Sequence, residues 1–219
     1  MEEVIFLFLY HKLDAVTLRH HQMLQQLHPR DQIIPVGYQL KVPEPIPGSV
    51  DVALDWDYGW PIDDIWPHVD KIYLRWFHRP NRPRARRYVF YEYDVLPKAP
   101  AHDFFGTTWN AEVAAVDIKT PDSDPAWLWW RHGSLLEMPK SLWQGLTPLA
   151  VQLWSDEALS RVANDRRFQR CYCELRLGTL AKMLGILPAI IPSASQTISW
   201  RAEDIKISDA PGWYHPVKG

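Results

Sequence analysis

Apolar residues dominate the start of the chain, and their spacing then changes from that of a strand to that of a helix. The run Val4–Tyr10 is continuously apolar, which predicts a strand buried on both faces, as in a parallel sheet. Asp14 suits a helix N-cap, and a stripe with helical spacing follows it as far as Pro29. The stripe consists of Val16, His20, Met23, Leu24 and Leu27. Gln32–Val36 predicts a second strand, which completes a βαβ unit.

The βαβ unit indicates where a ligand binds, because ligands of open α/β sheets lie at the carboxyl ends of the strands. Tyr10, His11 and Asp14 follow the first predicted strand directly. We therefore expect these residues at the binding edge of an α/β fold. A single histidine at such a position is also common in a loop without a ligand, so both interpretations of His11 stay open.

The run Tyr88–Leu96 (YVFYEYDVL) combines aromatic and β-branched residues with two acids, and it predicts a buried strand that ends before Pro97. Side chains alternate along a strand, so Glu92 and Asp94 would share one face. Two buried carboxylates need a cationic partner, and a divalent ion such as Mg²⁺ or Mn²⁺ would supply one. In the alternative interpretation, Asp94 caps a turn and Glu92 faces solvent.

Strand and helix patterns continue to alternate between these two regions. Val50–Leu54 predicts a short strand, and Ile65–Trp76 has the apolar spacing of an amphipathic helix. His78–Arg87 carries five arginines on a segment interrupted by prolines. It predicts either a phosphate or polyanion site or, more simply, a solvated loop. Glu112–Ile118 predicts a further strand.

Tryptophans gather in the segment Asp122–Gly133. In a strand, Trp127 and Trp129 would share one face and Trp130 would lie on the other. Their rings would either stack on an acceptor sugar or cover the hydrophobic core.

The last predicted helix contains another candidate residue, Glu174. Thr147–Trp154 is apolar but ambiguous in type, and Ser155 caps a helix that we expect to reach Arg167. A second helical stripe then ends at Gly185, a natural stop. The stripe consists of Leu177, Leu180, Ala181 and Leu184. Glu174 lies in the first turn, where a carboxylate either stabilises the helix dipole or acts as a general base facing a cleft.

Composition narrows the class of protein. With 219 residues the chain is most simply one domain, residues 1–219, and its net charge of −2 gives no general attraction to nucleic acid or anionic membranes. Two cysteines are too few for a disulfide framework or a structural zinc site. We find no secretory signal pattern and no apolar run of transmembrane length, so we expect a cytoplasmic protein.

The C-terminal sequence PGWYHPVKG places His215 and Lys218 on either side of Pro216 and Val217. Chain ends usually contribute few core contacts. We therefore expect that removing the residues from Trp213 onward would spare the core.

Together these features resemble a GT-A-type nucleotide-sugar glycosyltransferase. The resemblance rests on the N-terminal βαβ unit, the acids of Glu92-Tyr93-Asp94, the acid at a late helix start, and the terminal His-Pro-Val-Lys. It spans roughly Val4 to Lys218. It implies a Rossmann-type three-layer αβα sandwich with a mostly parallel central sheet.

The resemblance also implies roles for the candidate residues. Asp94 matches the second acid of the "DxD" metal motif, with Glu92 in place of the usual first Asp, and His215 matches a further ligand of Mn²⁺ or Mg²⁺. Lys218 matches a residue that contacts the diphosphate of a UDP- or GDP-linked donor, and Glu174 matches the catalytic base of inverting members. The implied reaction is sugar transfer to a glycan or small-molecule acceptor. The alternative is a non-catalytic protein that binds carbohydrate or nucleotide-sugar, although such modules are typically all-β.

Overall fold

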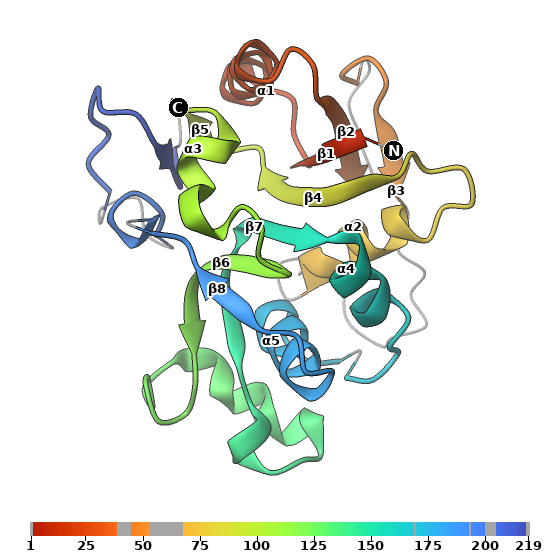
Figure 1. The fold of residues 1–219 in the computed structure, drawn as a ribbon, viewed down its shortest axis with the longest axis vertical. Helices are drawn as coiled ribbons and strands as arrows, with labels where there is room; N and C mark the ends of the chain where they lie inside the picture. Colours follow the sequence, from red (N-terminus) through yellow and green to blue (C-terminus); the bar gives the residue numbers. More distant parts are fainter. Residues whose placement is uncertain are drawn as a thin grey trace.

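A seven-stranded sheet with the strand order β3-β2-β1-β4-β7-β6-β8 runs through the protein (Figure 1). The computed structural model describes residues 2–38, 45–52, 68–168, 170–192, 194–199 and 205–217, with Tyr38 described by its backbone alone. β7 is antiparallel to both of its neighbours, and every other neighbouring pair is parallel. The predicted α/β architecture with a mostly parallel sheet is therefore confirmed.

The strands follow the apolar runs of the sequence. Those of the large sheet are β1 (Glu2–Tyr10), β2 (Gln32–Tyr38), β3 (Val50–Val52), β4 (Ala85–Glu92), β6 (Val113–Lys119), β7 (Gly145–Ser155) and β8 (Pro188–Ile190). A separate two-stranded sheet pairs β5 (Leu96–Pro97) with β9 (Trp213–Tyr214), so the end of the chain returns to the segment after β4.

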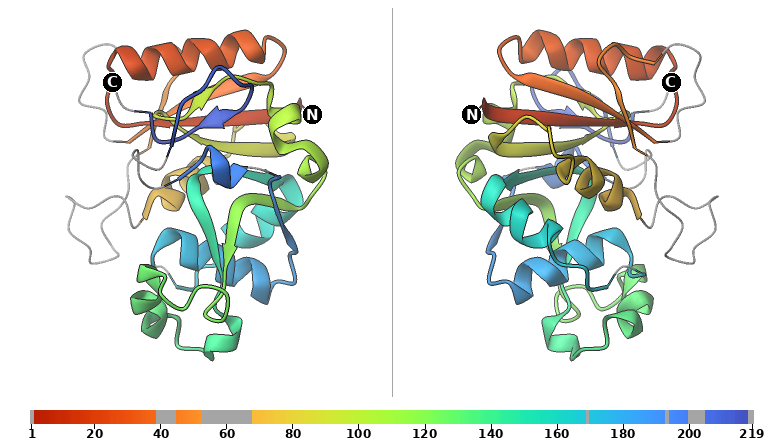
Figure 2. Two further views of the ribbon diagram at one scale, coloured as in Figure 1. Left: turned by 90° about the vertical axis from the view of Figure 1, so that its left-hand side faces the viewer. Right: turned by 90° about the vertical axis from the view of Figure 1, so that its right-hand side faces the viewer.

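Helices cover both faces of the large sheet (Figure 2). Because side chains alternate along β1, Ile5 and Leu7 face one core and Phe6 and Phe8 face the other. The first core is completed by α2 (Val69–Phe77), α4 (Asp156–Ala163) and α5 (Cys173–Met183). The second is completed by α1 (Ala15–Leu27), α3 (Ala101–Phe105) and β9. Short 3₁₀ turns are η2 (Gly106–Thr108), η3 (Leu128–Leu136), η4 (Lys140–Leu142) and η5 (Ala194–Gln196).

Several element boundaries differ from the predictions. β4 begins at Ala85, inside the predicted arginine loop, and ends at Glu92, where a turn closed by the Val95 N–H and the Glu92 carbonyl (3.0 Å) takes over. The α4 helix ends at Ala163, before the expected Arg167. The ambiguous segment before it is strand β7.

The tryptophan-rich segment is a 3₁₀ turn instead of a strand, so the predicted alternation of its rings is wrong. The ring of Trp129 stacks on Tyr172 with centroids 3.8 Å apart, and Trp130 donates to the Asp124 carbonyl (2.7 Å). Both rings pack against the core beside α5. Trp129 and Trp130 therefore cover part of the hydrophobic core.

Several arginines of the arginine-rich segment make contacts within the protein. The Arg82 guanidinium lies 3.7 Å from the ring centroid of Phe77 and donates to the Tyr88 hydroxyl. Arg84 pairs with Asp156 at 2.9 Å, and Arg87 donates to the Trp109 carbonyl at 2.7 Å. These three arginines anchor the start of β4, which accounts for them without a polyanionic ligand.

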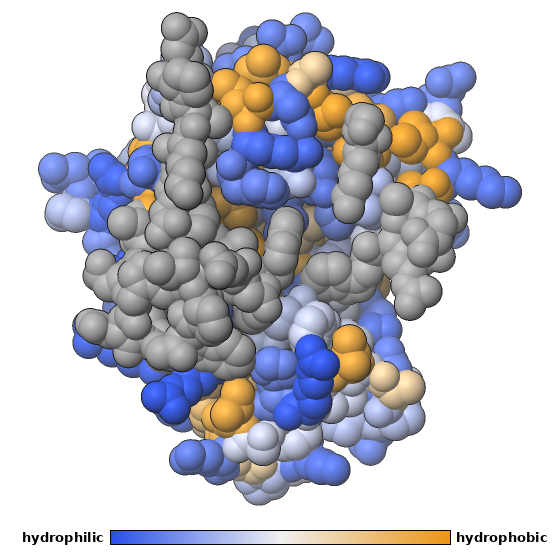
Figure 3. All heavy atoms as spheres, turned by 180° about the vertical axis from the view of Figure 1, so that it is seen from behind, coloured by the Kyte–Doolittle hydropathy of each residue, from blue (hydrophilic) through white to orange (hydrophobic). Residues whose placement is uncertain are grey.

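The described surface shows scattered apolar groups. Its large exposed apolar side chains are Leu18, Leu128, Leu135, Leu187, Ile190 and Ile207. On the face drawn in Figure 3 the described surface is mainly hydrophilic, with apolar side chains in separate groups. Among the described residues, none of the helices has the length and apolar character needed to cross a bilayer.

Candidate metal centre

The carboxyl end of β4 is held in place by β1 and α1. The Tyr93 N–H donates to the Leu9 carbonyl (2.9 Å), which extends the β1–β4 pairing by one bond. The Tyr93 carbonyl in turn accepts from His20 Nδ1 of α1 (2.9 Å). The backbone on which Glu92 and Asp94 lie is therefore fixed from two elements that precede it in the chain.

The C-terminal segment brings a histidine to this turn. The His215 N–H donates to the Thr197 carbonyl (3.0 Å), and the Val217 N–H donates to the Asp94 carbonyl (2.8 Å). His215 Nδ1 donates to the Ser199 carbonyl (2.8 Å), so its other ring nitrogen is the one directed at Asp94. The imidazole orientation is thus determined by backbone groups.

Glu92, Asp94 and His215 form one buried cluster. Each offers a ligand atom, and these atoms all lie within 4.8 Å of one another. His215 Nε2 is 3.3 Å from Asp94 Oδ1, a close contact without hydrogen-bond alignment, and this oxygen has no hydrogen-bond partner among the described residues. The turn at Asp94 replaces the predicted strand, but the two carboxylates still converge.

Burial and mutual charge interactions shift the pKa values of Glu92 and His215 in the cluster. Burial, followed by the nearby Asp94 charge, raises the pKa of Glu92 from 4.5 to about 7. Burial alone would lower the pKa of His215, but the carboxylates of Asp94 and Glu92 outweigh it and the net pKa is raised. Both shifts favour the protonated forms of Glu92 and His215.

These residues fit a divalent cation. Two carboxylates and an imidazole Nε2 are a donor set that Mn²⁺ accepts and that Mg²⁺ accepts through its oxygens. Asp94 Oδ1 is a buried acceptor without a hydrogen bond from the described residues, and a cation would satisfy it.

The other residues predicted at this edge have contacts of their own. The Tyr10 ring is buried and its hydroxyl lies 2.7 Å from Ser49 Oγ, which anchors the segment before β3. His11 is exposed, and its ring packs edge-on to Tyr93 with centroids 4.8 Å apart. Their role in donor binding stays a prediction.

Asp14 caps α1, as predicted from its place in the sequence. Its Oδ1 accepts from the Thr17 N–H (2.8 Å), and Lys12 lies 2.8 Å from Oδ2. Burial raises the pKa of Asp14, but the hydrogen bonds from Lys12 and Thr17 prevail and lower it to about 2. Donor binding by Asp14 stays a prediction, and Lys218 lies outside the described residues.

Glu174 lies at the start of α5 and is fully buried, with 0% of its surface exposed. Its Oε1 accepts from the Leu149 N–H (2.7 Å) at a point where the β6–β7 register shifts. Burial raises the pKa of Glu174 well above its usual value, and the Glu92 charge adds to the rise. In this geometry Glu174 secures the irregular part of β7, and its role as a base stays a prediction.

The sequence patterns did not predict the residues that orient the cluster. His20 belongs to the apolar stripe of the predicted helix, although a titratable ring on such a stripe is a sign of a specific partner. Thr197 and Ser199 act through backbone carbonyls, which no side-chain pattern reveals. The prediction that removing the residues from Trp213 onward spares the core is wrong, because that side chain is fully buried and its indole donates to the Ala99 carbonyl (2.8 Å).

Comparison with known proteins identifies the fold. No family model and no curated protein matches the sequence. Among solved structures, the chain is similar to the galactosyltransferase LgtC in complex with donor and acceptor sugar analogs, with a TM-score of 0.55 and 10% identity over 96% of this chain and 87% of that one. An active-site mutant of LgtC gives a TM-score of 0.54, also with 10% identity and the same coverage. The chain therefore has a GT-A-like α/β fold, similar to that of LgtC.

Proposed function

We propose that this protein is a metal-dependent glycosyltransferase that uses a nucleotide-diphosphate sugar as donor. The observation that carries the proposal is the buried cluster of Glu92, Asp94 and His215 at the carboxyl ends of the parallel strands. Ligands of open α/β sheets lie at that edge. The similarity in fold to LgtC supports the same class of reaction. A cytoplasmic location is part of the proposal.

Asp94 and His215 would hold Mn²⁺ or Mg²⁺, with Glu92 beside them. When bound, the ion supplies positive charge that stabilises the diphosphate leaving group as the glycosidic bond breaks. His215 is well suited to this task because the Ser199 carbonyl holds its ring in one orientation. Tyr93 and His20 keep the turn that carries Asp94 from shifting.

Inversion at the anomeric carbon requires a base that accepts the acceptor's proton, and Glu174 is our candidate for it. A carboxyl group with a raised pKa is a useful base only when it loses its proton near the working pH. Glu174 is fully buried, so an acceptor hydroxyl reaches it only after a rearrangement that exposes its carboxylate. A transfer with retention of configuration would not need Glu174 as a base, and NMR of the product anomer separates the two.

The decisive experiment combines binding and turnover. UDP and GDP should raise the melting temperature more with Mn²⁺ or Mg²⁺ present than in EDTA, because a ligand that binds the folded state stabilises it. Asp94→Asn should remove the metal-dependent part of the rise, whereas Asp122→Asn, at an exposed turn, should leave it intact. Equal nucleotide binding with and without EDTA would contradict the metal site.

A turnover measurement then distinguishes a glycosyltransferase from a non-catalytic nucleotide-sugar-binding protein. We expect release of nucleoside diphosphate from a sugar donor when an acceptor glycan is supplied. Metal-dependent donor binding without any transfer across donors and acceptors would instead identify a nucleotide-sugar-binding protein.

A further inference from the structure

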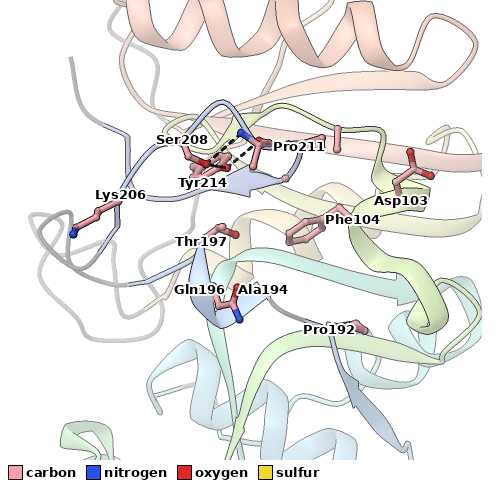
Figure 4. Close-up of a pocket in the computed structure, with 13 residues that line it drawn as sticks. Asp103, Phe104, Pro192, Ala194, Gln196, Thr197, Lys206, Ser208, Pro211 and Tyr214 are labelled. Carbon is pink, nitrogen blue, oxygen red and sulfur yellow. Dashed lines mark hydrogen bonds between the residues drawn. The ribbon is translucent and has the colours of Figure 1, made fainter.

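A cavity lies beside β9, next to the segment that leads to His215 of the metal centre. It has a volume of about 550 Å³, within the range of roughly 300–1,000 Å³ that is typical of small-molecule sites. Its walls come from α3, from η5 and from the segment that leads into β9 (Figure 4). Tyr214 of β9 lines this cavity, whereas the next residue, His215, belongs to the metal cluster.

The lining combines an aromatic ring with hydrogen-bonding groups. Phe104 stacks on Trp213 with centroids 4.7 Å apart and an interplanar angle of 5°, which fixes the ring, and in Figure 4 it points toward Thr197. Gln196 and Thr197 supply an amide and a hydroxyl, and Asp103 and Lys206 supply charges of opposite sign. A rigid aromatic surface surrounded by donors and acceptors, without excess charge, suits the apolar faces and hydroxyl edges of a sugar ring.

We propose that this cavity is a saccharide-binding subsite for a neutral mono- or disaccharide, separate from the donor site. The inference rests on the proposed function only for its biological purpose, because the binding itself requires neither nucleotide nor metal.

The subsite is connected to the metal centre through backbone. The Thr197 carbonyl at the cavity wall accepts from the His215 N–H (3.0 Å), and Tyr214 directly precedes His215. The cavity wall and the metal centre thus share one backbone hydrogen bond.

The experiment uses Trp213 as a reporter. Its indole N–H donates to the carbonyl of Ala99, a residue of the cavity wall, so its ¹H–¹⁵N resonance should respond to occupancy. The resonance is assigned with Trp213→Phe. The full-length protein in EDTA and without nucleotide is titrated with neutral α- and β-linked disaccharides up to about 20 mM, which would reveal a Kd of about 1 mM.

We expect a saturable shift for at least one disaccharide. Phe104→Leu keeps an apolar contact with Trp213 but loses the aromatic surface, and it should weaken binding by about two- to twelvefold. Gln196→Ala should also weaken binding, whereas Gln25→Ala on the exposed side of α1 should not.

Absence of a shift with every disaccharide, or equal binding by wild type and Phe104→Leu, would overturn the proposal. Because the titration contains EDTA and no nucleotide, its failure leaves the metal-dependent reaction untouched. Conversely, saccharide binding by a protein without transfer activity would support the subsite and not the enzyme.

Discussion

Replacing Glu92 by Gln should stabilise the metal-free protein at alkaline pH. Glu92 is only 8% exposed, and its pKa in the folded protein rises from 4.5 to about 7 through burial and the Asp94 charge. A raised pKa means that the folded state binds a proton more tightly than the unfolded state. Stability conferred by this group is therefore present below about pH 4.5 and is lost as the pH rises through about 7.

The size of this stabilisation follows from the pKa shift of Glu92. At about 1.36 kcal/mol per pKa unit, the rise from 4.5 to about 7 corresponds to roughly 3 kcal/mol of lost stability above pH 7. Gln has a similar shape and does not ionise, so Glu92→Gln avoids the loss. The figure of roughly 3 kcal/mol is an upper value, because the substitution also removes a charge that favours protonated His215.

The assay is urea unfolding followed by tryptophan fluorescence in EDTA at pH 5 and pH 8.5. We expect Glu92→Gln to raise the free energy of unfolding at pH 8.5 by about 1–3 kcal/mol and at pH 5 by less than about 1 kcal/mol. Asp122→Asn removes an exposed carboxylate and should change neither value. Parallel pH profiles for wild type and Glu92→Gln would refute the reasoning, as would a destabilised variant at pH 8.5.

His215, Glu174 and the buried ion pair between Asp70 and Arg176 give further predictions. His215→Ala should remove the stabilisation by Mn²⁺ seen in wild-type thermal melts, and full retention of the shift would exclude His215 as a ligand. If Glu174 is the base, Glu174→Gln should lower turnover by about 10²–10⁴-fold with donor affinity nearly unchanged; if it only secures β7, turnover should stay nearly intact. Asp70→Ala should destabilise the protein by about 3–5 kcal/mol in urea unfolding, because it leaves the buried Arg176 guanidinium without its carboxylate, and a loss below about 1 kcal/mol would show that water reaches the pair.

The amino-acid sequence by itself determined the elements whose cause is local. An unbroken apolar run produced β1, the side chain of Asp14 capped α1, and Gly185 (φ +68°) ended the segment after α5. The acids Glu92 and Asp94 could likewise be recognised from the sequence, because charged residues stand out in a buried apolar run.

Only the tertiary structure decided what depends on contacts between distant segments. The sequence could not show that the strand would end at Glu92, because the turn at Asp94 is held by His20 and by the chain end. Nor could it show that Glu174 would lie in the core or that Trp129 would stack on Tyr172, since the same residue types occur on surfaces and in sites. Periodicity records which side of its own helix or strand a residue occupies, whereas the partner on that side is set by how the elements pack.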